Sequence, residues 1–325
     1  MRTIRVAAAP AAALAAALLF AGCTLQEAPH ADSTVVSAAS QKAARTWNPD
    51  TYKAPAVDST PDDQFEISAF RGLAILTKTR DSLGDYVGGN LNCVSCHLDE
   101  GRRPNAAPLV GVTARYPRYV DRVDAVVTIE DRVNYCMTRS LAGTKLPNDS
   151  REMADIVAYL TVISRGVPVG EHVKGEGLKA MPKDVPRDSA RGHALFKDNC
   201  ARCHGTNGQG IGVVPALWGA KSYSIGASMA RVERAASFIR SNMPFDRPGS
   251  LTDAQAFDIA AYINSMTRPD LPGKENDWPQ GNPPADTPYE TKGHLAGWAP
   301  RVIPRATNLA GAIVPPPSSV VNRRR

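Results

Sequence analysis

The hydrophobic and polar positions along the chain predict two similar pairs of amphipathic helices. From Pro61 onwards, apolar residues recur at helical spacing until the pattern ends near Gly84. The next strong pattern lies in "DSREMADIVAYLTVIS", where Asp149 and Glu152 are placed as a cap pair. The residues expected to face the core in these two helices are Ile67, Phe70, Leu73 and Ala74, then Met153, Ile156, Val157 and Leu160.

The second half of the chain repeats this design. A helix is expected in "PRDSARGHALFKDN" and a closing helix in "LTDAQAFDIAAYINSM", where Thr252 and Gln255 form a capping box. The predicted buried stripe of the closing helix is Ala256, Ile259, Ala260 and Ile263. The closing helices also match in sequence, because "DIVAYL" at 155–160 corresponds to "DIAAYI" at 258–263. The pattern therefore predicts an all-α chain with two domains of similar design.

The first 22 residues resemble a secretory signal. Arg2 and Arg5 precede the apolar run "AAAPAAALAAALLFAG", which is too short and too rich in Ala for a membrane span. The run ends in "LFAGC", which is similar to the lipobox of bacterial lipoproteins, with Phe20 in place of the usual Leu and Cys23 as the lipid-bearing residue. Ordinary cleavage, with Cys23 lost or left free, is the alternative. We expect a periplasmic protein, tied to a membrane only if Cys23 is lipidated.

The net charge adds little to this interpretation. A formal charge of +6, reduced by signal removal, gives no nucleic-acid-binding profile. No later segment is apolar enough to span a membrane.

The cysteines add a cofactor. The chain has six, and four of them lie in the CxxCH motifs "NCVSCH" and "NCARCHG". Two thiols three residues apart can each form a thioether to a porphyrin vinyl group, and the next residue then directs its imidazole at the iron. A zinc site or disulfide pairs are the alternatives. Nothing else in the sequence supplies a second CxxC or HxxxH half for them. The residues that attach the two haems c are Cys93 and Cys96 with His97, and Cys200 and Cys203 with His204.

Helices and motifs together predict two class I cytochrome c-like domains in tandem, each with one covalent haem c. The expected segments are a signal peptide at 1–22, a flexible tether at 23–61, a first cytochrome c domain at 62–166, a linker at 167–186, a second cytochrome c domain at 187–268, and an extended Pro-rich tail at 269–325.

The repeat suggests a role for an isolated cysteine. Met243, followed by Pro, lies 39 residues after His204 and is typical of the sixth iron ligand of a small c-type cytochrome. The same 39 residues counted from His97 lead to Cys136. We expect Cys136 to be the distal ligand of the first haem. A buried inert cysteine, ligation by Met137, and Met229 in place of Met243 remain alternatives.

A thiolate ligand changes the expected chemistry. It stabilises ferric iron and lowers the potential, the opposite of Met. Sulfur is also a nucleophile and a leaving group in exchange reactions. A reactive cysteine next to two one-electron centres therefore suits a two-electron reaction that joins two sulfur atoms.

From about Gln64 to Tyr289, the chain resembles the dihaem thiosulfate dehydrogenases (tetrathionate synthases). These bacterial periplasmic cytochromes c oxidise two thiosulfates to tetrathionate, often reversibly. The resemblance is carried by "YVGGNLNCVSCHLDEG", "PLVGVTARYPRY", "RVNYCMTRSLAG", "LPNDSREM", "GQGIGVVPALWG", "SNMP" and "AAYINSMTRPD".

The resemblance implies that His97 and Cys136 ligate a catalytic first haem, and that the second haem, ligated by His204, passes electrons on. In the family the second distal ligand can switch between a Lys and the adjacent Met. This chain has Asn242 at the Lys position, which favours plain His204/Met243 ligation.

A dianionic substrate predicts cations around the first haem. Arg122, Arg132 and Arg139 flank Cys136 in sequence, and Ser140 can donate a hydrogen bond. All of these except Arg139 match active-site positions in the family. Partners of haem propionates or solvated surface are the alternative roles. Weaker candidates are Arg115 and Arg118, and the histidines expected not to be ligands are His30, His172, His193 and His294.

The resemblance also leads to a mechanistic hypothesis. Cys136 leaves the iron, its sulfur bonds to one thiosulfate, and a second thiosulfate attacks to release tetrathionate. The electrons leave through a small periplasmic cytochrome or a membrane quinol-linked partner. The alternatives are a non-catalytic dihaem electron carrier, a physiological tetrathionate reductase, and a cytochrome subunit like those of the multi-component sulfur-oxidising system. Dihaem peroxidases are disfavoured, since no peroxide-cleaving acid or calcium loop stands out.

Overall fold

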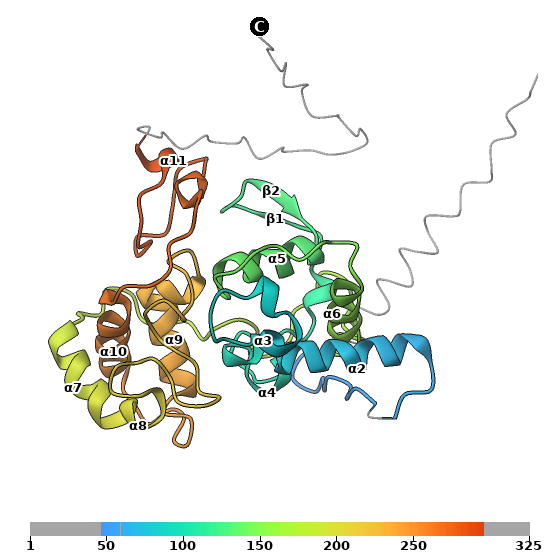
Figure 1. The fold of residues 1–325 in the computed structure, drawn as a ribbon, viewed down its shortest axis with the longest axis horizontal. Coiled ribbons are helices and arrows are strands. Elements are labelled where there is room, and N and C mark those ends of the chain that lie inside the picture. The colour runs from blue at the N-terminus through green and yellow to red at the C-terminus, as the bar shows by residue number, and fades with distance from the viewer. Residues whose placement is uncertain (1–46, 59, 296–325) are drawn as a thin grey trace, which may run out of the picture. The chain divides into compact units, whose positions relative to one another are not determined.

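The computed structural model describes residues 47–58 and 60–295 and consists of two helical halves (Figure 1). Within this part of the chain, the strands are β1 (Arg118–Val120) and β2 (Ala125–Val127), which form one short antiparallel hairpin. The predicted all-α class is confirmed. The predicted signal peptide, Cys23, His30 and the tail beyond residue 295 lie outside the described residues, as does the side chain of His294.

The first half is built on the pair α2 (Gln64–Thr77) and α6 (Arg151–Val162), which lie side by side (Figure 1). The predicted buried face of α2 is wrong. Phe70 is exposed, and the buried residues of the helix are Ala69, Gly72, Ile75 and Leu76. A Cβ on Gly72 would lie 2.0 Å from the carbonyl oxygen of Asp155 in α6. Close contact between the two backbones therefore selects small residues for this face of α2.

The start of α6 also differs from the prediction. Ser150, rather than Asp149, is the N-cap, and its side chain accepts a hydrogen bond from the Met153 backbone N–H. The predicted apolar face is confirmed, with Val157 only partly buried. On the same helix, the buried carboxylate of Asp155 accepts two hydrogen bonds of 2.7 Å from Arg71 of α2.

The second half repeats this contact between α7 (Ser189–Asn199) and α10 (Asp253–Ser265). A Cβ on Gly192 would lie 2.0 Å from the carbonyl oxygen of Asp258. The Asp258 carboxylate in turn accepts hydrogen bonds from Arg191. The Thr252–Gln255 capping box and the predicted buried stripe of α10 are confirmed. The internal repeat is thus present in three dimensions as the same Arg, Gly and Asp arrangement.

Shorter elements surround the two helix pairs. In the first half they are α3 (Thr79–Ser82), η1 (Gly84–Tyr86), η2 (Cys93–Ser95), α4 (Leu98–Gly101), η3 (Val112–Ala114) and the longer α5 (Ile129–Arg139). Later in the chain they are α8 (Ala201–His204), η4 (Ser228–Ala230), α9 (Val232–Asn242), η5 (Lys274–Asn276) and α11 (Lys292–Leu295).

Two segments flanking the helical domains pack onto them. Trp47, Tyr52 and Val57, in the stretch predicted as a tether, contact the first hydrophobic core, and the Tyr52 hydroxyl donates to the Arg165 carbonyl oxygen at 2.8 Å. In the stretch predicted as an extended tail, Asp277 and Trp278 are buried. Both stretches therefore contribute to the folded body close to the domains.

Across residues 47–58 and 60–295, no helix combines the length and the apolar character needed to cross a bilayer.

Candidate active site

The two CxxCH motifs present their histidines in the same way. The Nδ1 atom of His97 lies 2.6 Å from the Ala107 carbonyl oxygen, and Nδ1 of His204 lies 3.0 Å from the Pro215 carbonyl oxygen. A carbonyl accepts only from a protonated nitrogen, so each ring keeps the unprotonated Nε2 available as a metal ligand. None of the five cysteines in the described ranges forms a disulfide. Thiols and imidazoles therefore fit covalent haem attachment in both halves.

Cys136 lies on α5 and faces His97. Nη1 of Arg132 donates a hydrogen bond to the Cys136 sulfur at 2.8 Å, and the His97 side chain lies close to the same sulfur. Burial raises the pKa of the Cys136 thiol, but the charge of Arg132 and the contact with His97 outweigh burial and bring the pKa down to about 6. His97 and Cys136, which the equal offset in the two halves paired, thus lie close together. The lowered pKa favours the thiolate form of the Cys136 sulfur.

The neighbouring methionine is placed differently. Met137 is 1% exposed and packs within the first hydrophobic core. Consecutive residues on a helix point in directions about 100° apart, so only one of the two can face His97. The packing favours Cys136 over Met137 as the group opposite that histidine.

Two more of the predicted arginines lie near Cys136. The side chains of Arg122 and Arg139 are buried, and their guanidinium carbons lie 5.7 Å and 4.3 Å from the ring centre of Tyr135. Arg132 lies 5.4 Å from the same ring. Three cations thus surround the residue that precedes Cys136 on α5.

The other candidates of the first half divide into two groups. Ser140 is the C-cap of α5 and its backbone N–H bonds the Cys136 carbonyl oxygen, which keeps it one turn from the sulfur. Arg115 instead pairs with Glu176, and Arg118 lies exposed on β1 over the Tyr116 ring. Arg115 and Arg118 therefore lie in contacts separate from the cluster around Tyr135.

The second half offers two methionines. Met243 is the C-cap of α9 and packs against the second hydrophobic core. Met229 lies in η4 and contacts both the first and the second core. Asn242 is 2% exposed, and its Nδ2 donates to the carbonyl oxygens of Phe238 and Asn105, each at 3.1 Å. The Asn242 side chain is committed to these bonds.

The remaining histidines that the structure describes make ordinary contacts. His172 is paired with Glu176, and His193 stacks on Tyr262. Within the described ranges, no group of three or more His, Cys, Asp or Glu side chains is arranged to hold a metal ion.

Comparison with known proteins fits these sites. The cytochrome c domain model of SoxA/TsdA matches residues 88–169, and a cytochrome c model matches residues 189–267. Thiosulfate dehydrogenase of Psychrobacter arcticus is 40% identical over 73% of this chain and 74% of its own length. The chain belongs to the thiosulfate dehydrogenase family. Members of this family are oxidoreductases, and the two matched domains carry two covalently bound haems c.

Two further comparisons agree with this. Thiosulfate dehydrogenase of Allochromatium vinosum is 37% identical over 66% of this chain and 83% of its own length. The solved thiosulfate dehydrogenase (TsdBA) from Marichromatium purpuratum has a TM-score of 0.65 and 31% identity over 68% of this chain. This chain covers 50% of that solved protein.

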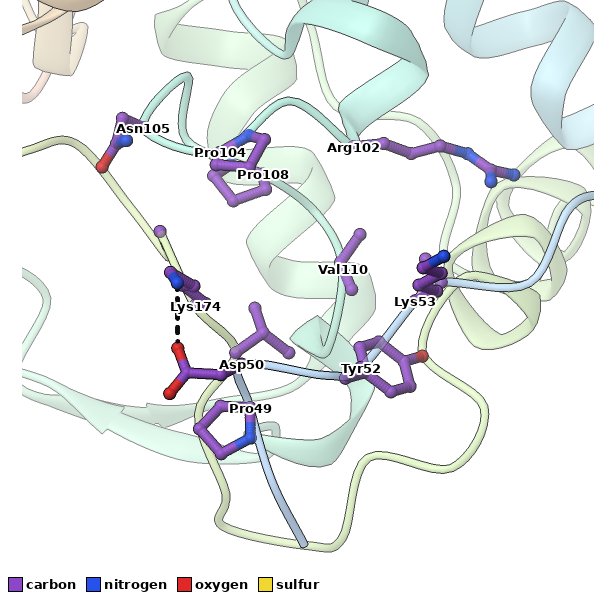
Figure 2. A pocket seen from close by; sticks show the side chains of 13 residues that line it. Pro49, Asp50, Tyr52, Lys53, Arg102, Pro104, Asn105, Pro108, Val110 and Lys174 are labelled. Carbon is purple, nitrogen blue, oxygen red and sulfur yellow. Dashed lines mark ion pairs between the residues drawn. The ribbon is translucent and has the colours of Figure 1, made fainter.

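A separate cavity of this thiosulfate dehydrogenase family member lies elsewhere among the described residues. A cavity of about 410 Å³ opens beside residues 49–54, and its lining includes Asp50, Tyr52, Arg102 and Lys174 (Figure 2). Lys174 pairs there with Asp50 at 3.0 Å. None of the CxxCH residues and none of the arginines around Tyr135 line this cavity. It is therefore distinct from the cluster around Cys136.

Three residues of the site have no signal in the sequence patterns. Asp277, Trp278 and Tyr289 come from the Pro-rich stretch after the second domain, yet all three contact the arginines or each other beside Tyr135. A lone acid and two aromatics in an aperiodic stretch look like surface residues. A Trp in such a polar segment was the one feature that could have indicated packing.

Proposed function

We propose that this protein joins two thiosulfates into tetrathionate and passes the two electrons to its haems. The observation that carries the proposal is the Cys136 sulfur held between His97 and Arg132. The names of relatives that match over most of their length support thiosulfate as the substrate. A plain electron carrier has no use for a cation bonded to an unattached thiolate.

In this proposal, His97 and Cys136 would hold the iron of the first haem. His204 and Met243 would hold the iron of the second. Asn242, whose Nδ2 donates to two backbone carbonyl oxygens, leaves Met243 without a competing ligand at the preceding position. When bound, the two haems c supply two one-electron acceptors, the first at a lower potential than the second.

The chain's own residues bind and orient the anions. Arg132 stabilises the Cys136 thiolate and offers its other N–H groups to a thiosulfate oxygen. Arg122 and Ser140 complete the cationic and hydrogen-bonding lining. The low-dielectric surroundings of these half-buried groups strengthen their attraction for a dianion.

Cys136 then acts as a carrier of one thiosulfate. Its thiolate and the outer sulfur of a first thiosulfate form a sulfur–sulfur bond as two electrons leave. A second thiosulfate attacks the outer sulfur, the bond to Cys136 breaks, and tetrathionate and the Cys136 thiolate are released. Both steps conserve sulfur and charge. The net result is the loss of two electrons, both in the first step.

For the setting of this reaction, we propose the periplasm, with an acceptor that is a small periplasmic cytochrome or a membrane quinol-linked partner. Lipidation of Cys23 would keep the protein at a membrane surface. The location and the anchor are supported by the N-terminal sequence, and the acceptor by the resemblance to the family.

A steady-state assay of the holoprotein with thiosulfate and ferricyanide tests the reaction. A second assay with tetrathionate and a reduced viologen measures the reverse direction. Turnover in the first assay, with tetrathionate as the sulfur product, is the expected result. Intact haems without turnover in either assay would leave only an electron-transfer role.

A further inference from the structure

Asp277 is a buried carboxylate outside both haem domains that holds an arginine near Cys136. It is 3% exposed, and its two oxygens accept hydrogen bonds from Nη1 and Nη2 of Arg139 at 2.8 Å and 2.6 Å. The Tyr289 hydroxyl donates to the same carboxylate, and Nε of Arg122 lies 3.9 Å from it. Such a two-pronged pair is the strongest geometry for an arginine and a carboxylate.

The residues next to Asp277 enclose Arg122 as well. The Trp278 backbone N–H donates to the Arg122 carbonyl oxygen at 2.8 Å, and the guanidinium carbon lies 4.3 Å from the Trp278 ring centre. Nη1 of Arg122 donates to the Gly226 carbonyl oxygen at 2.9 Å. Arg122 is therefore fixed at its backbone, at one nitrogen and over its flat face.

Two side chains, Tyr135 and Arg132, connect these contacts to the sulfur of Cys136. The Tyr135 ring lies against Arg139 at 4.3 Å and against Arg132 at 5.4 Å, and Arg132 bonds Cys136. A change at Asp277 that releases Arg139 therefore acts on the immediate surroundings of the reactive sulfur.

The charges differ between the three arginines. Asp277 neutralises Arg139 and occupies both terminal nitrogens of its fork. Arg122 has only the longer 3.9 Å contact with Asp277, and Arg132 bonds Cys136, so these two arginines supply the positive charge for an anion. With Arg139 released, three cations would converge on the site, and anions would be held more tightly.

We propose that Asp277 is a positioning residue that holds Arg139 away from the substrate and thereby limits how tightly the site binds a dianion. This rests on the proposed function, since thiosulfate and tetrathionate are the anions concerned. Weak enough binding lets the dianionic product leave after each turnover. Arg139, although it lies on α5 seven residues after Arg132, then pairs with Asp277 of the segment that follows the second domain and does not touch substrate.

The test measures sulfate, an unreactive dianion, by calorimetric titration of the oxidised holoprotein at low ionic strength. For Asp277→Asn, we expect sulfate to bind about tenfold more tightly. We also expect tetrathionate to inhibit more strongly, kcat to fall because the product leaves more slowly, and the KM for thiosulfate to fall with it. In the double variant Asp277→Asn with Arg139→Met, sulfate affinity should return to within about twofold of wild type, because the released cation is gone.

Unchanged sulfate affinity in Asp277→Asn, or tighter binding that persists in the double variant, would overturn the proposal. If Asp277→Asn alone fails to fold, the double variant decides, because it removes Arg139 without leaving Asp277 as an unpaired buried charge beside Arg122. Sulfate affinity within about twofold of wild type supports the proposal, and a tenfold loss overturns it. Missing thiosulfate turnover in the wild type would reject the proposed function, while the sulfate titrations would still decide the role of Asp277.

Discussion

Nη1 of Arg132 lies 2.8 Å from the sulfur of Cys136, one turn further along the same helix. This spacing is fixed by α5, because residues i and i+4 share a face of a helix. The cation therefore does not depend on loop conformation to reach the sulfur. It lowers the pKa of the thiol and leaves other donors of the same guanidinium free for an anion.

Arg132→Gln should lower kcat/KM for thiosulfate about 100-fold, because it removes a charge that stabilises both the thiolate and the bound dianion. Arg132→Lys should recover only part of the loss, since an ammonium cannot bond two acceptors in one plane. Arg151→Gln, at an exposed position in the first turn of α6, is the matched control for loss of one positive charge. Equal activity in all three variants would argue against a role for Arg132.

Cys136→Gly should abolish turnover while both haems stay attached, since the four CxxCH cysteines are untouched. We expect a loss of at least about 1000-fold in kcat, as for removal of a nucleophile. Cys136→Met restores a sulfur ligand without a reactive thiol and should be equally inactive. Electron paramagnetic resonance of the oxidised wild type should show one low-spin haem with a thiolate ligand, and this signal should be missing from both variants. Near-wild-type activity in Cys136→Gly would contradict the mechanism.

Met243→His should lower the potential of one haem and leave the other unchanged, because imidazole stabilises ferric iron relative to a thioether. A spectroelectrochemical titration of the holoprotein measures both potentials. Met229→Leu is the control, as it removes the competing thioether and keeps its volume. A potential shift in Met229→Leu but not in Met243→His would assign the ligand to Met229 instead.

Gly72→Ala should lower the free energy of unfolding by about 1–3 kcal/mol, because a methyl group cannot fit between α2 and α6 without moving a backbone. Gly192→Ala should act similarly on the second half. Gly84→Ala is the control, since an added Cβ there has no neighbour within 4 Å. Thermal unfolding of the holoproteins gives the comparison. Equal melting temperatures for Gly72→Ala and Gly84→Ala would contradict the close contact.

Several local features could be predicted from the sequence because neighbouring residues determine them. The Thr252–Gln255 box and the stripe of α10 depend on spacing within one helix. The pairing of Cys136 with His97 followed from comparing two halves of one chain, so each half served as a template for the other.

Contacts between distant segments could not be predicted in this way. The apolar pattern of α2 favoured Phe70, yet the approach of α6 selected Gly72. Asp277 pairs with Arg139, which lies 138 residues earlier in the chain. No periodic pattern indicates that a single carboxylate after the second domain will fold back onto α5. The three arginines looked equivalent in sequence, and only their partners distinguish them.

The loop between residues 105 and 107 serves both halves at once. The Ala107 carbonyl oxygen accepts a hydrogen bond from the ring of His97 and fixes its orientation. Two residues earlier, the Asn105 carbonyl oxygen accepts a hydrogen bond from the side-chain amide of Asn242, the residue before Met243. A few covalent bonds and two hydrogen bonds thus link the neighbourhoods of the two iron sites. Any insertion or deletion in this short bridge would disturb both redox centres together, so one potential could not be tuned there independently of the other.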